Sequence, residues 1–129
     1  MPATFLAASD LVCLLDRRAS EHGLARDLMR IEFEAGSALL TSNYAVLAAS
    51  LDLQRSYGVA GPRALAEGLL PAMHVAWATR RDHQLGFAAL VAGGEHDADG
   101  PAPDLGLRVD RQVAARVGAE LFTSWLGGE

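Results

Sequence analysis

The chain has 129 residues, half of them hydrophobic and only 6% aromatic, which suits one domain with a core of Ala, Leu and Val. Its formal net charge of −5 does not support RNA binding, although every basic residue is Arg, the side chain best suited to planar contacts with phosphate. No apolar run is long enough to cross a bilayer and no basic segment precedes a signal core, so we expect a cytoplasmic protein without a membrane partner.

The first predicted elements are a strand and two helices. Residues 4–8 form a short apolar run that predicts a buried strand. Ser9–Asp10 is expected to cap a helical turn that ends near Asp16. A second helix is predicted over residues 20–36, where Gly36 supplies the left-handed residue that ends it. The side chains expected to face the core from this second helix are Leu24, Leu28, Ile31 and Ala35.

Residues 38–57 are the most informative stretch of the chain. A strand over 38–41 leads directly into a helix over 44–57, which is the local unit of an α/β sheet. Ser42 and Asn43 lie between them, and their side-chain oxygens can accept hydrogen bonds from the first turn of the helix. Two adjoining apolar stripes predict burial on a wide face. The stripes contain Val46, Ser50, Leu53 and Tyr57, and Tyr44, Leu47 and Leu51.

A second strand and helix follow a short helix over residues 62–70. Residues 74–78 predict a strand, and Thr79 with Asp82 predicts a capping box at the start of a helix over 80–92. The side chains expected to be buried in that helix are Leu85, Ala88, Ala89 and Val91 or their neighbours.

Residues 95–104 have the composition of a flexible loop, because they are acidic, contain Gly and Pro, and include no large apolar side chain. The acids of this loop lack the ligand spacing of a Ca²⁺ loop, so a mobile solvated segment is favoured over a metal site. A last helix is predicted to end at Gly118, and residues 120–124 predict a final strand.

The order of these elements predicts the fold class. Strands alternate with helices along the whole chain, and no repeat or linker divides it, so we expect one α/β domain over residues 1–129. The alternation predicts a central parallel sheet with helices on both faces.

Several blocks of the chain resemble PIN-domain ribonucleases, a family that includes toxins of toxin–antitoxin pairs. The residues that carry the resemblance are SDLVCLLDRRASEHGLARDLM (9–29), TSNYAVLAASLDLQRSYG (41–58), HVAWATRRDHQLGFAAL (74–90) and DLGLRVDRQVAARVGAELFTSW (104–125). The resemblance implies a three-layer α/β/α sandwich. It also implies a cluster of carboxylates at the strand ends that holds Mg²⁺ or Mn²⁺ and activates water for phosphodiester hydrolysis.

Most of that acidic cluster is missing from this sequence. The resemblance places the family's acids at Ala7, at Ala48, at Asp110 and at Trp125, beside Ser124, so only Asp110 keeps its carboxylate. Loss of a group that contacts the metal commonly lowers rates by factors of hundreds or more. The pattern therefore predicts a degenerate site with no metal, or with Asp110 as the ligand if any is bound.

Three other acids could form a relocated site, namely Asp10, Asp16 and Asp52. Each has a simpler interpretation, as a helix cap, a residue at a helix end and a solvent-facing residue respectively. Ligands must also converge in space, which spacing in the sequence does not establish.

Two functions are consistent with these observations. The favoured one is a catalytically degenerate PIN-like domain that acts by binding, as a homodimer or with a protein partner such as an antitoxin. The alternative is a Mg²⁺- or Mn²⁺-dependent endoribonuclease, the toxin of a toxin–antitoxin pair. The two differ in whether several carboxylates converge at the carboxyl ends of the strands.

Overall fold

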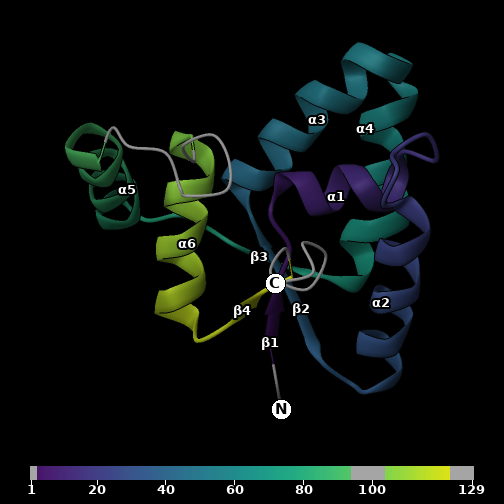
Figure 1. Ribbon diagram of the computed structural model, residues 1–129, viewed down its shortest axis with the longest axis horizontal. Coiled ribbons are helices and arrows are strands. Elements are labelled where there is room, and N and C mark those ends of the chain that lie inside the picture. The colour runs from purple at the N-terminus through teal and green to yellow at the C-terminus, as the bar shows by residue number, and fades with distance from the viewer. Residues whose placement is uncertain (1–2, 94–103, 123–129) are drawn as a thin grey trace.

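A parallel sheet forms the centre of the structure, a computed structural model that describes residues 3–93 and 104–122 (Figure 1). Its strands are β1 (Ala3–Phe5), β2 (Ala38–Ser42), β3 (His74–Ala76) and β4 (Glu120–Leu121). They lie in the order β3-β2-β1-β4, and all neighbouring pairs are parallel. The register places Thr4 between Leu39 and Glu120, and Leu40 beside His74. The predicted parallel sheet is therefore confirmed.

Helices cover both faces of this sheet. They are α1 (Ala8–Leu15), α2 (His22–Glu34), α3 (Asn43–Tyr57), α4 (Ala60–Ala64), α5 (Arg80–Gly93) and α6 (Leu105–Val117), with a π-helical turn (Leu65–Leu69) and a 3-10 turn (Leu70–Ala72) after α4. In Figure 1, α5 and α6 lie on one side of the strands, and α1 and α2 lie on the other. This arrangement confirms the predicted three-layer α/β fold.

The core has one part on each side of the sheet, because successive strand residues point to opposite faces. Leu39 belongs to the part that α1, α2 and α3 cover, together with Leu11 and Leu53. Phe5 belongs to the part that α6 covers, together with Val109 and Val113.

The ends of several elements follow the predicted chemistry. The Ser42 hydroxyl accepts a hydrogen bond from the Ala45 amide at 2.9 Å and so caps α3. Thr79 and Asp82 form the predicted capping box, with reciprocal hydrogen bonds of 2.9 and 3.1 Å. Gly36 and Gly118 adopt positive φ angles of 77° and 74°, where a side chain would be strained.

The predicted start of α1 is wrong by two residues. The residue at the N-terminal cap is Ala7, not Ser9 or Asp10. Asp10 lies three positions further on, and its Oδ2 accepts a hydrogen bond from the Ala7 amide at 2.8 Å. A carboxylate can satisfy a free amide from this third position as well as from the cap itself, which explains the error.

The predicted burial of α3 on a wide face is correct only in part: Leu53 is buried, and Val46 and Tyr44 pack against the core, but other residues of the two stripes do not. The buried side chains are Ala45, Ala49 and Leu53, whereas Leu47 is 63% exposed and Leu51 is exposed too. Close packing selects the small residues: a Cβ added to Gly61 of α4 would lie 2.6 Å from the backbone oxygen of Leu53. Neighbouring helices approach α3 too closely for a stripe of large side chains.

Helices α2 and α5 face the core mostly with other residues than those predicted, although Leu28 of α2 packs against the core as expected. In α2, Leu24 and Ile31 are exposed, while Ala25 and Glu32 are buried. The Glu32 carboxylate accepts a hydrogen bond from the Thr4 hydroxyl at 2.7 Å, which compensates its burial. In α5, the buried residues are Asp82 and Gly86, and Leu85 and Val91 are exposed.

Two predictions concern segments that the structure covers only in part. Of the predicted flexible loop over 95–104, only Asp104 is described, where it caps α6. Residues 123–125, which include the end of the predicted last strand and Trp125, lie outside the described residues. Within residues 3–93 and 104–122, no helix is both long and apolar enough to span a membrane.

Replacing Gly86 with Ala should destabilise the domain. The added Cβ would lie 2.7 Å from Val109 Cγ2 and 2.9 Å from its backbone nitrogen, so α5 and α6 would have to separate. Overpacking of this kind costs about 1–3 kcal/mol, measurable by urea unfolding. The matched control is Gly23→Ala in α2, where nothing lies within 4 Å of the added atom. Equal stability of the two variants would contradict the close approach.

Candidate functional site

The carboxyl ends of the parallel strands bring several functional positions to one edge of the sheet. Ala7 follows β1, Ser42 ends β2, and Trp77 follows β3. In open α/β sheets this edge is where ligands bind. Asp110 reaches the same edge from the first half of α6, because its carboxylate contacts Ser42.

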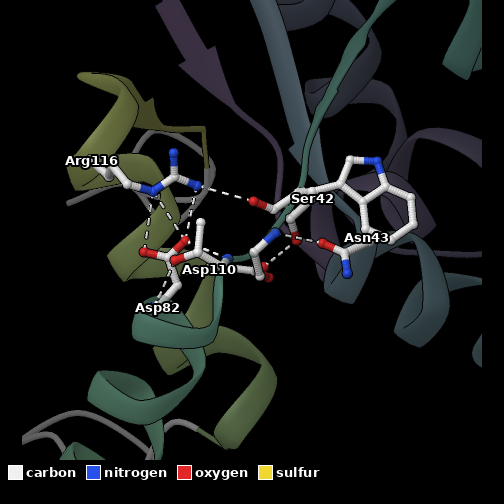
Figure 2. Close-up of polar contacts among 8 residues, drawn as sticks. Ser42, Asn43, Asp82, Asp110 and Arg116 are labelled. Atoms are coloured by element: carbon white, nitrogen blue, oxygen red, sulfur yellow. Dashed lines mark hydrogen bonds and ion pairs between the residues drawn. The ribbon is translucent and has the colours of Figure 1, made fainter.

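The contact between Ser42 and Asp110 is the centre of the site (Figure 2). The Ser42 hydroxyl donates a hydrogen bond to Asp110 Oδ1 at 2.5 Å, and both side chains are buried. The same hydroxyl accepts from the Ala45 amide, so its proton is directed towards Asp110. One side chain thus caps α3 and orients the carboxylate of α6.

Asp110 is an acid that is costly to ionise in this position. It is only 2% exposed, and its burial raises its pKa to about 6, against the opposing effect of the Ser42 hydrogen bond. The negative charges of Asp104 and Asp10 raise this pKa further. A nearby cation would favour the ionised form and offset both effects.

Of the three alternative acids, Asp10 is the one whose negative charge raises the pKa of Asp110. It is fully buried at the start of α1, where its Oδ2 holds the Ala7 amide. A buried carboxylate of α1 and one of α6 therefore lie within electrostatic reach of each other at the edge of the sheet.

Asp16 and Asp52 take part in other contacts. Asp16 accepts a hydrogen bond from the Tyr57 hydroxyl at 2.5 Å, and this bond, with that from the Arg18 amide, lowers its pKa. Asp52 pairs with Arg55 at 3.2 Å on the exposed side of α3. Neither contact connects these acids to Asp110.

The other positions that the resemblance assigns to the acidic cluster offer no ligand. Ala7 is buried, Ala48 is partly buried on α3, and a methyl group cannot coordinate a metal. Trp125 is outside the described residues. Among residues 3–93 and 104–122, no group of three or more His, Cys, Asp or Glu side chains could together hold a metal ion.

A polar framework beside the site was not predicted from the sequence. Asn43 Oδ1 accepts a hydrogen bond from the Ala78 amide at 2.7 Å. Arg116 donates to Asp82 at 2.9 Å and to the backbone oxygen of Trp77 at 3.1 Å. Burial disfavours the ionised form of Asp82, but hydrogen bonds from Arg116 and Thr79 outweigh it and keep its pKa below the usual value. The Thr79–Asp82 capping box was the part of this framework that the sequence predicted, and it gave no indication that Arg116 contacts Asp82 and Trp77.

Comparison with known proteins identifies a fold but no close relative. No protein-family model matches the chain, and no curated protein matches it either. Among solved structures, VapC20 of Mycobacterium tuberculosis, described as a sarcin–ricin loop cleaving toxin, is similar with a TM-score of 0.72. The similarity covers 91% of this chain and 85% of that chain at 21% sequence identity. At this identity the likeness is one of fold, and it confirms the PIN-like architecture expected from the resemblance.

The Asp110→Asn variant should lose a specific pH dependence of stability when a chelator keeps metal away. Between the usual pKa of 3.8 and about 6, the folded state retains a proton that the unfolded state has lost. The free energy of unfolding should therefore fall by about 2–3 kcal/mol as the pH rises through this window. Asn cannot ionise, so the variant should gain stability relative to the parent between pH 4 and 7, as urea unfolding would measure.

The difference between the two unfolding curves isolates Asp110, because other titrating groups are common to both proteins. Asp52→Asn serves as the control, since that carboxylate is exposed. Parallel pH curves for the parent and Asp110→Asn would contradict the raised pKa.

Proposed function

We propose that this chain, which has the PIN-like fold, is a metal-dependent endoribonuclease of the toxin type with a reduced acidic site. The observation that carries the proposal is the buried Asp110, which Ser42 orients at the carboxyl edge of the sheet with Asp10 within electrostatic reach. The fold of a toxin described as cleaving the sarcin–ricin loop supports RNA as the class of substrate. This choice reverses the preference based on the sequence alone.

The residues present fit one divalent cation better than a pair of cations. Mg²⁺ is commonly held by one or two carboxylates together with waters and substrate phosphate oxygens. Asp110 would be the principal ligand, and Asp10 would contribute its charge nearby. When bound, Mg²⁺ or Mn²⁺ would polarise the phosphate and lower the pKa of a coordinated water.

The residues around Asp110 have separate tasks in this proposal. Ser42 fixes the orientation of the carboxylate through its 2.5 Å hydrogen bond. The buried surroundings keep the local dielectric low, which strengthens the attraction between a cation and the ionised acid. At pH values below about 6 the proton on Asp110 competes with the metal.

A second candidate function is a binding module without catalysis. The alanines at positions 7 and 48 favour it, because the PIN-domain resemblance implies carboxylates there. Under this function the chain would act through a protein partner such as an antitoxin, and no metal would be needed.

Cleavage of single-stranded RNA distinguishes the two candidates. With millimolar Mg²⁺ or Mn²⁺ the parent should cleave, and Asp110→Asn should lower the rate by about 100-fold or more, because it removes the principal metal ligand. Asp52→Asn is the matched control and should cleave at the parent rate. The readout is the initial rate of cleavage of an end-labelled RNA.

The contrary outcomes identify the second candidate. Cleavage that Asp110→Asn leaves unchanged comes from other groups of the chain or from a contaminant, and in either case it rules out the proposed site. If the parent is inactive, the pair Ala7→Asp and Ala48→Glu should raise affinity for Mg²⁺, seen as a metal-dependent increase in Tm. The isosteric pair Ala7→Asn and Ala48→Gln should show no such increase.

We also propose a homodimer in the cytoplasm, with an antitoxin-like protein as a further partner. The start of α3 contacts α5 where the Tyr44 hydroxyl and His83 Nδ1 lie 2.6 Å apart. Leu47 and Phe87, each about one turn further along these helices, are large, apolar and exposed, and we propose that a second copy of the chain covers them.

Light scattering of the purified chain should return twice its mass of 13.6 kDa. The variant Leu47→Glu should shift the mass towards that of the monomer, because it places a charge in the proposed contact. Leu24→Glu on α2 is the control, since this exposed leucine lies on another helix. A monomeric parent at high concentration would contradict the dimer.

A further inference from the structure

Trp77 is a large aromatic side chain exposed at the edge of the sheet that carries the proposed site. It follows β3 directly and is 70% exposed. Hydrogen bonds of neighbouring residues connect Trp77 to the site. The Ala78 amide donates to the side chain of Asn43, and Ser42, the residue before Asn43, donates to Asp110. The indole is therefore exposed at the same edge of the sheet as the proposed site.

The backbone that carries Trp77 is held firmly. Its carbonyl oxygen accepts a hydrogen bond from Arg116 Nη2 at 3.1 Å, and the next amide donates to Asn43 Oδ1 at 2.7 Å. The residue after that, Thr79, is fixed by its capping box with Asp82. Figure 2 shows Asn43, Asp82 and Arg116 in this framework. A side chain on a fixed backbone loses little conformational freedom on binding a ligand.

Uncompensated positive charge lies next to Trp77. Arg80 and Arg81 begin α5 and are exposed, and neither forms an ion pair with any residue that the structure describes. A cavity of about 340 Å³ opens beside Arg81 between α5 and α6. Its lining residues include Arg81, Leu85, Gln112 and the Asp82–Arg116 ion pair, so it combines polar groups with an apolar wall.

We infer that Trp77 stacks against an unpaired base of single-stranded RNA while Arg80 and Arg81 contact the adjoining phosphates. This inference rests on the proposed ribonuclease function, for which it supplies the substrate-binding surface. Aromatic faces accept any base, so the contact would hold the strand without selecting a sequence. The net charge of −5 does not prevent it, because local positive charge attracts phosphates within about 8 Å at physiological salt.

A protein partner is the competing occupant of an exposed tryptophan. The two exposed arginines, which form no ion pair with the described acids, favour the nucleic acid because RNA carries a phosphate at every nucleotide. A protein contact would instead need acidic side chains on the partner.

Binding is measured best without cleavage, as the fluorescence anisotropy of a labelled single-stranded RNA in a chelator. Trp77→Ala should weaken binding by about 5- to 100-fold, the usual effect of removing one stacking side chain. Trp77→Phe should keep most of the affinity because it keeps an aromatic face. The matched control is Phe33→Ala on α2, which removes another aromatic side chain, 65% exposed, and should change nothing.

The arginines are tested through salt dependence. For single strands, the logarithm of affinity falls with the logarithm of salt concentration by about 0.7 for each phosphate contact. Arg80→Gln and Arg81→Gln should each reduce the slope by about this amount. Arg63→Gln removes an exposed arginine of α4 and should leave the slope unchanged.

The outcomes separate this inference from the ribonuclease proposal. Unchanged RNA affinity in Trp77→Ala overturns the inference, and if metal-dependent cleavage persists, the ribonuclease proposal stands alone. Trp77-dependent binding by a chain that never cleaves supports the inference and overturns the ribonuclease. A change of oligomeric mass in Trp77→Ala without a change in RNA affinity assigns the indole to a protein contact, which also overturns the inference.

Discussion

The Ser42 hydroxyl connects the elements on which the candidate site depends. It ends β2, caps α3 through the Ala45 amide and donates to Asp110 on α6, so one oxygen atom ties the sheet to a helix on each side of it. Because Ser42 contacts three elements, it cannot shift with one of them without breaking its contacts to the others. The carboxylate of Asp110 is therefore oriented by the end of β2, and orientation of this kind helps precise coordination or catalysis.

The buried carboxylates at this edge of the sheet bear on the choice between a domain that is only a scaffold and one that holds a working site. Two acids remain buried there, although isolated buried carboxylates cost stability unless a partner compensates them. Asp10 has a structural reason to stay, because it satisfies the Ala7 amide. Among the described residues only Ser42 donates a side-chain hydrogen bond to Asp110, and a bound cation would compensate this charge more fully.

Residue types at short spacing in the sequence were sufficient to predict the fold, but not to predict which side chains of the helices face the core. The strands, the Ser42 cap and the Thr79–Asp82 capping box follow from residue types at short spacing, which act within one turn. The inward faces of α2, α3 and α5 did not follow from hydrophobicity, because neighbouring helices approach closely enough to select Ala and Gly over Leu and Val. The Ser42–Asp110 pair joins residues 68 positions apart, and no local pattern encodes such a contact. The family resemblance supplied Asp110, but the influence of Asp10 on it required the three-dimensional arrangement.

The attachment of α5 to the rest of the domain, mainly through α6, has a consequence for dynamics. Within the described residues this helix buries only Asp82 and Gly86, and its contacts include the ion pair to Arg116, a hydrogen bond from Arg108 to the Ala89 carbonyl and the close approach of Gly86 to Val109. Such a helix can detach in a local opening that costs less free energy than unfolding of the sheet. Its backbone amides should then exchange with solvent independently of those in α3 and α6. The segment that presents Trp77 is joined to this helix at the Thr79–Asp82 capping box, so an opening of α5 would release one of the contacts that hold the backbone beside the indole.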